Sequence, residues 1–327
     1  MPSSYFYAAY GFLLESDQPI PNLIPLDSPV HLPILRIRFD ETPSVSGAWI
    51  THPHAIDRSG DAYRHLFVLT DSEAQRYTRF IFEDDGATFT VDVAGATIWV
   101  AHPERLTRAY VCDYLVNAIL SYYLRMTGRT CLHASAVQID SPEGERAILF
   151  VADSGMGKST LATYFARQGH VALSDDVSAL TAQDDGIAVA PGYPYLRVTA
   201  QTTEALFGAV TALKKVAPDW HKRVVTLADR PPRPDQLIPI SAVYIIADRA
   251  ETLVFEPFTP RDAAIALMDY ATLYYLFDPA VRARDFTMLS HLAAACPVYK
   301  LTTPADLTRL PDVYGAILEQ HRVLSPG

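Results

Sequence analysis

The stretch Arg146-Ala-Ile-Leu-Phe-Val-Ala-Asp-Ser-Gly-Met-Gly-Lys-Ser-Thr160 joins a nearly all-apolar run to a glycine-rich turn. The apolar run up to Ala152 is typical of a strand that is buried on both faces of a sheet. The residues from Lys158 to Gln168 are amphipathic and are followed by Gly169, which predicts a helix that ends there. A strand, a glycine-rich turn and a helix in this order are the context of a phosphate-binding loop, or P-loop.

The P-loop pattern gives each residue of the turn an expected role. Gly155 and Gly157 let consecutive backbone N–H groups point inward at phosphate oxygens, and the helix N-terminus adds its positive dipole end. Lys158 is expected to reach the β- and γ-phosphates, and the Ser159 hydroxyl to ligate Mg²⁺. Ala152 stands where the usual pattern has its first glycine, at a strand end where a methyl group fits. The residues expected to bind the nucleotide are Asp153, Ser154, Gly155, Met156, Gly157, Lys158, Ser159 and Thr160.

A pair of carboxylates follows the predicted helix, in Leu173-Ser-Asp-Asp176. An acid at the end of an apolar strand after a P-loop helix is where a Mg²⁺ ligand belongs, and one acid is enough for that purpose. The second can accept a proton from an attacking hydroxyl group. The pair therefore favours phosphoryl transfer over simple nucleotide hydrolysis, with a solvated turn or a helix cap as the plain structural alternative.

The rest of the chain divides into three parts. From Tyr5 to about Val100, short alternating runs separated by turns predict a series of hairpins. The next part has apolar residues that recur every three and four positions, which predicts one long helix, and after Cys131 strands and helices alternate, which favours an α/β layer fold. We expect an N-terminal β-rich domain at residues 1–103, a bridging helix at 104–128 and a P-loop domain at 129–327.

Within the last part, the segment from Cys131 to Ile139 is predicted to be one continuous strand, and the segment from Arg261 to Phe277 one helix. The strand would carry His133 and would directly precede the P-loop strand. Consecutive strands often lie next to each other in a sheet. We therefore expect His133 to lie near the P-loop.

The composition is that of an ordinary globular protein, with 327 residues, 49% of them hydrophobic and 20% charged. The net charge of −10 argues against binding nucleic acid or an anionic membrane. There is no signal peptide and no membrane-spanning apolar run, so we expect a soluble cytoplasmic protein. Cys112, Cys131 and Cys296 have the spacing of neither a zinc cluster nor a disulfide framework and are expected to be core thiols. Thr51-His-Pro-His54 has no obvious third ligand for a metal.

Four segments together resemble the catalytic core of HPr kinase/phosphorylase, namely His133-Ala-Ser135, Ala152 to Leu161, Arg167-Gln-Gly-His170 and Ser174-Asp-Asp176. The resemblance is closer to the HPr-kinase-like serine kinases found with ribosomal peptide clusters, including the lasso peptide kinases. Their N-terminal part also carries a segment like Tyr10-Gly-Phe-Leu-Leu-Glu-Ser16. The motifs cover about residues 130–200, and the remainder matches by length and layout only.

The resemblance implies a P-loop kinase fold related to phosphoenolpyruvate carboxykinase, with ATP or another nucleoside triphosphate and Mg²⁺ as cofactors. The implied reaction transfers the γ-phosphoryl group to a serine hydroxyl of a peptide or small protein, in the closer set a lasso-type precursor peptide. It also implies a catalytic His133, Asp175 as the base and Asp176 as a Mg²⁺ ligand, with an exchange of roles between the two aspartates left open. The arginine- and glycine-rich C-terminal loop of the bifunctional enzyme has no clear counterpart, which argues against phosphorolysis.

Three alternatives to that function stay open, namely the bifunctional HPr kinase/phosphorylase activity, a non-catalytic nucleotide-binding regulator and a small-molecule kinase. Arg197, in a segment similar to one in the family, either faces the transferring phosphoryl group or is a surface arginine. Lys222 or Arg223 either forms a phosphate clamp across a homo-oligomer interface or belongs to a solvated basic turn. If His133 tunes Asp175, their side chains must lie within hydrogen-bond reach.

Overall fold

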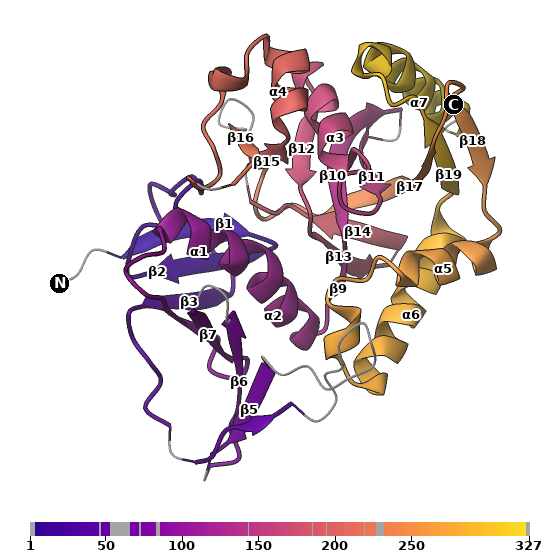
Figure 1. Cartoon of the computed structure of the whole chain (residues 1–327). Coiled ribbons are helices and arrows are strands. Elements are labelled where there is room, and N and C mark those ends of the chain that lie inside the picture. The colour runs from indigo at the N-terminus through magenta and orange to yellow at the C-terminus, as the bar shows by residue number, and fades with distance from the viewer. Residues whose placement is uncertain are drawn as a thin grey trace.

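The computed structural model describes residues 4–45, 47–52, 66–71, 73–82, 86–142, 144–184, 186–193, 195–218, 220–226 and 232–324. Its strands form two large sheets and one small one. In Figure 1 the first sheet and the helix that follows it occupy one half of the molecule, and the second sheet with the remaining helices occupies the other. The chain is a mixed α/β protein.

The N-terminal sheet has eight strands in the order β1-β2-β3-β8-β7-β6-β5-β4. Strands β5 to β8 form an antiparallel meander, as the alternating runs predict, whereas β3 pairs in parallel with both β2 and β8. The strand bounds are Tyr5–Ala9 (β1), Phe12–Ser16 (β2), Ile34–Phe39 (β3), Ile50–Thr51 (β4), Leu66–Thr70 (β5), Arg76–Phe82 (β6), Ala87–Asp92 (β7) and Thr97–Ala101 (β8).

The bridging helix begins at Arg108 rather than at Glu104. The Thr107 hydroxyl accepts a hydrogen bond from the Tyr110 N–H and fixes the helix N-terminus at that point. The helix consists of α1 (Arg108–Tyr114), a π-helical turn (Leu115–Ile119) and α2 (Leu120–Met126). Such π-helical turns are frequent at functional sites.

The second sheet has nine strands. Seven of them run in the order β12-β10-β11-β17-β14-β13-β9, and β19 pairs with both β17 and β18. The strand β11 that leads into the P-loop is antiparallel to β10 and parallel to β17. The bounds are Thr130–Leu132 (β9), Ala134–Ser141 (β10), Gly144–Val151 (β11), Val171–Ser174 (β12), Ser178–Gln183 (β13), Gly186–Ala190 (β14), Ile238–Arg249 (β17), Val254–Pro257 (β18) and Val298–Thr303 (β19).

Helices flank this sheet, and a two-stranded sheet of β15 and β16 lies beside it. The bounds are Lys158–Arg167 (α3), Tyr195–Val198 (β15), Ala200–Phe207 (α4), Arg223–Thr226 (β16), Pro260–Met268 (α5), Pro279–Ala295 (α6) and Leu310–Leu324 (α7), with short 3-10 turns at Val210–Ala212 (η2), Tyr274–Leu276 (η3) and Leu307–Arg309 (η4).

Two predicted elements are interrupted at one place in the fold. The strand expected from Cys131 to Ile139 breaks at His133, and the helix expected from Arg261 to Phe277 ends at Met268. The His133 N–H donates to the Tyr270 carbonyl oxygen at 2.7 Å, and the Thr272 N–H donates to the Cys131 carbonyl oxygen at 2.9 Å. These long-range backbone bonds replace the local pairing that the periodicity favours, because tertiary context overrides propensity.

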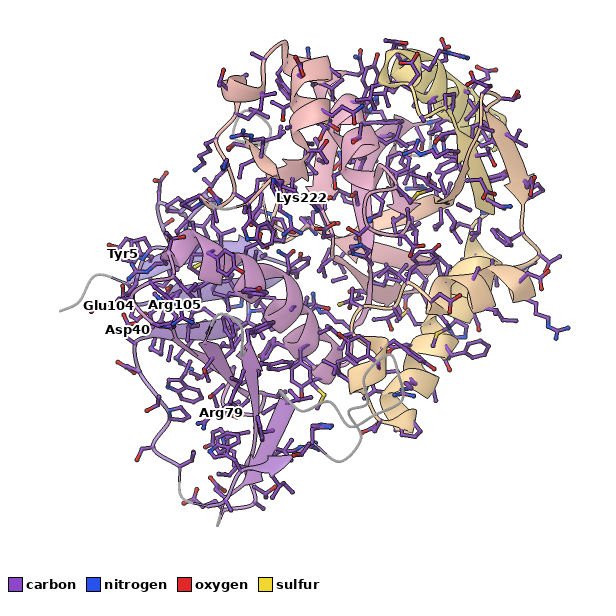
Figure 2. All side chains as sticks on the ribbon, in the orientation of Figure 1. Tyr5, Asp40, Arg79, Glu104, Arg105 and Lys222 are labelled. Atoms are coloured by element: carbon purple, nitrogen blue, oxygen red, sulfur yellow. The ribbon has the colours of Figure 1, made fainter. Side chains whose placement is uncertain are left out.

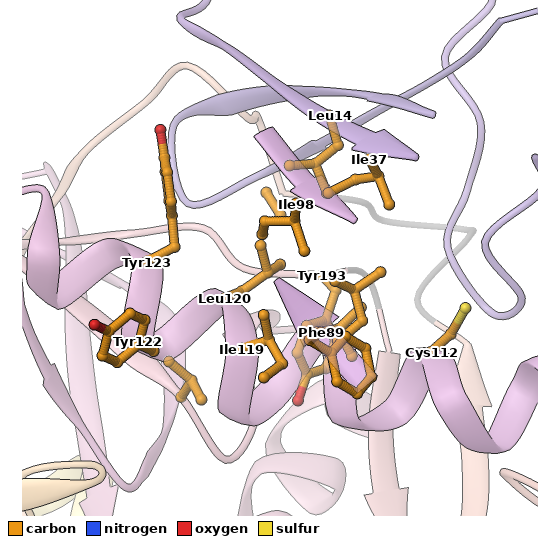
Figure 3. Close-up of a cluster of buried hydrophobic side chains, with 14 of the residues drawn as sticks. Leu14, Ile37, Phe89, Ile98, Cys112, Ile119, Leu120, Tyr122, Tyr123 and Tyr193 are labelled. Carbon is orange, nitrogen blue, oxygen red and sulfur yellow. The ribbon is translucent and has the colours of Figure 1, made fainter. Parts of the chain in front are cut away.

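One hydrophobic core crosses the predicted domain boundaries. It joins strands of the first sheet and the bridging helix to residues near the P-loop, among them Val177 and Tyr193. Figure 3 shows Leu14, Ile37 and Ile98 against Leu120 of the helix. The division of the chain at residues 103 and 128 stays a prediction.

The three cysteines are free and buried, as expected, and burial raises the pKa of each thiol to about 12.

No helix in the described part of the chain combines the length and the apolar character needed to cross a membrane.

Candidate active site

The predicted site residues meet at one edge of the second sheet because of strand direction. Strands β11 and β12 are both antiparallel to β10, and β17 is parallel to β11, so the carboxyl ends of β11, β12 and β17 lie at the same edge. Strand β19 is parallel to β17 and ends there too. Ligands of α/β sheets bind outside the carboxyl ends of the strands. The P-loop, the aspartate pair and the end of β17 at Arg249 therefore face one region.

The P-loop has the backbone that its sequence predicts. Gly155 and Gly157 have φ values of 86° and 97°, which side chains with a Cβ rarely adopt. Gly157 is the N-cap of α3 and offers no side-chain cap, so the first N–H groups of the helix are left for a ligand. Ala152 is buried in the core and is not among the residues with positive φ, which explains why alanine is tolerated there.

Lys158 is buried, and its ammonium group is fully bonded. It donates to His133 Nε2 and to the Ala152 carbonyl oxygen, both at 3.0 Å, and to the Asp153 carbonyl oxygen at 3.3 Å. Burial lowers the pKa of Lys158 below its ordinary value, although Asp176 and Asp175 oppose this shift. To reach a phosphate group, Lys158 must exchange at least one of these three bonds.

The partners of His133 determine its tautomer. Nδ1 lies 3.1 Å from the Asp176 carbonyl oxygen, which can only accept, so Nδ1 carries the proton. Nε2 is then an acceptor for the Lys158 ammonium group. Burial, and next the charge of Lys158, lowers the pKa of His133 below its ordinary value. His133 is therefore a neutral ring that holds the P-loop lysine.

The expectation that His133 bonds the Asp175 carboxylate is wrong. That carboxylate is fully buried and takes three other donors: Ser135 Oγ at 2.6 Å and Ser159 Oγ at 2.8 Å on Oδ1, and the Arg197 N–H at 2.8 Å on Oδ2. His133 reaches the backbone of the neighbouring aspartate instead. Asp175 is thus fixed behind the P-loop serine.

Asp176 differs from Asp175 in conformation and in exposure. Its φ is 58°, in the left-handed region that few residues other than glycine adopt, and 14% of its side chain is exposed. Its Oδ2 accepts a hydrogen bond from Arg197 Nη2 and lies 3.7 Å from Lys222 Nζ. Burial alone would raise the pKa of Asp176, but these two cations, with His133 and Lys158, hold it well below its usual range.

Arg197 is a buried clamp, so the alternative that it lies on the surface is wrong, whereas the alternative that it faces a transferring phosphoryl group stays a prediction. Its Nη1 donates to both carboxylate oxygens of Asp113 at 2.7 and 2.8 Å, and its Nη2 donates to Asn117 Oδ1 at 2.9 Å as well as to Asp176. Arg197 therefore ties the bridging helix to the aspartate pair. Asp113 and Asn117 were missed in the sequence because nothing local marks a helix residue that faces a distant strand.

Lys222 lies beside the site of its own chain, near the junction of the two halves of the molecule (Figure 2). It precedes β16, which pairs with the strand that carries Arg197. About a third of its side chain is exposed, so its ammonium group can approach a ligand beside Asp176. The site thus contains this cation without a second copy of the chain. A phosphate clamp formed by Lys222 or Arg223 across a homo-oligomer interface stays a prediction.

The part of the chain that the structure describes was compared with the ligand sets that metal ions need. Among the described residues, no group of three or more histidine, cysteine, aspartate or glutamate side chains could hold a metal ion. His52 Nε2 lies 3.0 Å from Arg76 Nη2, and His54 lies outside the described residues. Mg²⁺ at phosphate sites is typically held by one or two side chains plus phosphates.

Ser159, Asp175 and Asp176 fit such an ion by their chemistry. Because the Ser159 hydroxyl donates its proton to Asp175, its oxygen lone pairs are left for a cation. All eight residues predicted to bind nucleotide, from Asp153 to Thr160, lie on the loop or the first turn of α3.

Arg249 was not predicted as a site residue, but it contacts the P-loop from the end of β17. Its Nη2 donates to the Met156 carbonyl oxygen at 2.5 Å, and its Nη1 donates to Thr303 Oγ1 at 2.6 Å and to the Pro304 carbonyl oxygen at 3.0 Å. Beside it lies a cavity of about 250 Å³ that the P-loop shares with α4 and with the segment from β19 to α7.

No protein-family model and no curated protein matches the chain. Among solved structures, it is similar to the HPr(Ser) kinase/phosphatase from Coxiella burnetii, with a TM-score of 0.34 and 12% sequence identity over 59% of this chain and 90% of that one. A similarity this weak carries no argument about activity. The function therefore has to be inferred from the residues of the site.

Proposed function

We propose that the protein is an ATP- and Mg²⁺-dependent serine kinase that transfers the γ-phosphoryl group to a serine hydroxyl of a peptide or small protein. The observation that carries this proposal is the unequal environment of the aspartate pair. Asp175 is buried and bonded to the P-loop serine, whereas Asp176 is partly exposed beside two cations. A nucleotide hydrolase or a simple binding protein needs only the first of these acids.

The geometry supports an exchange of the roles that the family resemblance implies. Asp175 orients the Ser159 hydroxyl so that both serve the metal ion, which would neutralise charge on the β- and γ-phosphates. Asp176 is the acid that an acceptor hydroxyl can approach. Its low pKa keeps it ionised, and a carboxylate of low basicity is sufficient where the hydroxyl proton leaves late in a loose transition state.

In the transfer step, the serine oxygen forms a bond to the γ-phosphorus while the bond from that phosphorus to the β–γ bridging oxygen breaks. The hydroxyl proton passes to Asp176. The products are a phosphoserine and a nucleoside diphosphate. Lys158 and the P-loop amides stabilise the charge on the leaving diphosphate, and His133 holds Lys158 in place as a positioning residue.

The acceptor is proposed on the family resemblance, which favours a ribosomally made precursor peptide of the lasso type. The half-exposed Lys222 beside Asp176 would attract the anionic phosphoryl group or an acidic residue of the acceptor. The net charge of −10 favours such a local cation over a broad basic surface. We also propose a homo-oligomer, in which Lys222 or Arg223 would clamp a phosphate group across the interface, and a cytoplasmic location.

The test is phosphorylation of an array of serine peptides with ATP labelled at the γ-phosphate, each peptide paired with its alanine counterpart. We expect label on serine peptides only. Asp176→Asn should lower transfer by about 100-fold or more, or about 2.7 kcal/mol, while ADP affinity changes little. Asp175→Asn should weaken Mg²⁺-dependent nucleotide binding, and Asp184→Asn, at an exposed position away from the site, should change neither quantity.

Two outcomes would contradict the proposal. Tight Mg²⁺–ATP binding with no labelled peptide and only slow hydrolysis would indicate a nucleotide-binding regulator. Equal loss of nucleotide binding in both aspartate variants would refute the division of roles. Release of pyrophosphate from a phosphorylated peptide on addition of phosphate would instead indicate the bifunctional kinase/phosphorylase.

A further inference from the structure

Asp176 lies at the apex of a strained turn. The Val177 N–H donates to the Asp175 carbonyl oxygen at 2.7 Å, and the φ of Asp176 between them is 58°. A hydrogen bond from residue i+2 to residue i around a positive φ is the pattern of the classic γ-turn, which is rare and strained. The common inverse form has a central φ of about −75° and the mirror-image backbone, so it would project the Asp176 side chain in a different direction.

Two side chains hold the peptide groups on either side of Asp176. The Tyr193 hydroxyl donates to the Asp175 carbonyl oxygen at 2.6 Å, and His133 Nδ1 lies 3.1 Å from the Asp176 carbonyl oxygen. A strained backbone conformation persists only where the surrounding structure over-determines it. These two bonds therefore oppose the relaxation of the turn to its inverse form.

The hydroxyl of Tyr193 is fixed from the bridging helix as well. It lies 2.7 Å from Asn117 Oδ1, which belongs to the π-helical turn, so its one proton is shared between two acceptors. Figure 3 shows Tyr193 in the buried cluster that contains Ile119 of the same turn. Tyr193 is 1% exposed, and burial raises the pKa of its hydroxyl well above the usual range, so the hydroxyl keeps its proton.

The ring of Tyr193 is backed by the N-terminal hairpin of β1 and β2. Its centroid lies 6.3 Å from that of Tyr10, at the hairpin tip, with the two rings perpendicular. The Tyr10 N–H donates to the Pro191 carbonyl oxygen at 2.6 Å. A Cβ on Gly192 would lie 2.9 Å from the Tyr10 ring, so the glycine lets the two segments meet this closely. The hairpin tip therefore fixes the segment that carries Tyr193.

We propose that Tyr193 is a positioning residue for phosphoryl transfer, whose hydroxyl holds the strained turn so that the Asp176 carboxylate faces the acceptor serine. This inference rests on the proposed function, in which Asp176 receives the serine proton. Tyr193 is buried and acts through Asp176 rather than on the substrate. The N-terminal half of the molecule thus contributes to the active site through Tyr10, and the bridging helix through Asn117.

The test uses Tyr193→Phe, which keeps the ring and removes only the hydroxyl. The Asp175 carbonyl oxygen keeps the Val177 N–H, and Asn117 Oδ1 keeps Arg197 Nη2, so the variant should fold with little change in melting temperature. With the serine peptide that the wild type labels best, kcat should fall by about tenfold, because small misplacements of a reacting group are costly. The KM for that peptide and the affinity for Mg²⁺–ADP should each change by less than about twofold.

Two further variants separate positioning from a general loss of structure. Tyr122→Phe, which removes a buried hydroxyl that lies 2.9 Å from Thr78 Oγ1, is the matched control and should leave kcat unchanged. In an Asp176→Asn background, Tyr193→Phe has no base left to position, so it should lower the remaining transfer by less than about twofold. A tenfold loss in that background, or an unchanged kcat in the single variant, overturns the inference.

A crystal structure of Tyr193→Phe gives a readout that does not depend on activity. We expect Asp176 to adopt a negative φ in place of 58°. A left-handed Asp176 that persists in the variant refutes the role of the hydroxyl in holding the turn. A wild-type protein that labels no peptide overturns the kinase function and, with it, the role of Tyr193 in transfer, whereas the crystal structure still decides whether Tyr193 holds the turn.

Discussion

Replacement of Arg197 by methionine should destabilise the protein far more than the loss of a surface arginine. Methionine keeps the apolar part of the side chain and removes the guanidinium, which contacts Asp113, Asn117 and Asp176. Asp113 is 4% exposed, so water cannot replace the hydrogen bonds that its carboxylate loses in the variant. Breaking a buried ion pair by removing one partner typically costs about 3–5 kcal/mol, whereas an exposed pair is worth about 0–1 kcal/mol.

Protonation sets an upper limit on this cost. Burial already raises the pKa of Asp113 despite the opposing charge of Arg197. Without the guanidinium this pKa rises further, and a carboxyl whose pKa is higher in the folded than in the unfolded chain loses stability as the pH rises. The destabilisation in Arg197→Met should therefore be larger at pH 8 than at pH 5.

The assay is equilibrium unfolding in urea, which does not screen ion pairs as guanidinium chloride does. With a urea m-value of about 3 kcal/mol/M, the midpoint should fall by about 1–1.7 M. The double variant with Asp113→Asn should be more stable than the sum of the two single losses predicts. A loss below about 1 kcal/mol in Arg197→Met, with no dependence on pH, would refute the buried clamp.

Three further changes have outcomes set by single contacts. Lys158→Ala should lower phosphoryl transfer by at least about 100-fold, measured with the labelled ATP, and near wild-type turnover would exclude the P-loop site. His133→Gln should cost less stability at pH 5 than at pH 7. The stability that a histidine with a lowered pKa contributes is present above about pH 6.5 and is lost as the pH falls. Equal losses of stability at both pH values, measured by urea unfolding, would contradict a neutral buried ring. Gly192→Ala would place a Cβ 2.9–3.1 Å from atoms of the buried Tyr10 side chain, so it should lower the free energy of unfolding by about 1–3 kcal/mol. An unchanged urea midpoint would show that the packing around Tyr10 rearranges at little cost.

The local elements of the site could be predicted from the sequence because their determinants are contiguous. The P-loop strand, its two left-handed glycines and the helix from Lys158 follow one another in the chain, and the structure has all three. The same holds for the strand that ends at Ser174 before the aspartate pair. Apolar runs, glycines and helix ends are read from neighbouring residues, so no distant contact can hide them.

The break at His133 and the early end of the helix at Met268 could not be predicted in this way. Each depends on backbone bonds between segments more than a hundred residues apart, which outweigh the local periodicity. The partner of His133 depends on the same break, which turns its ring toward Lys158 and the Asp176 backbone rather than toward the Asp175 carboxylate.

The sequence by itself determined which residues can bind phosphate, because the P-loop is built from adjacent backbone groups and one lysine. Only the tertiary structure decided what each charged residue does there. Asp175 and Asp176 are neighbours in the chain, yet one is buried behind Ser159 and the other is partly exposed beside Lys222. Arg197 and Arg249 look alike in the sequence, but Arg197 donates to the Asp113 carboxylate, whereas Arg249 donates to the Met156 carbonyl oxygen. The environment of a charge is set by all the segments that surround it, and those segments come together only when the sheets form.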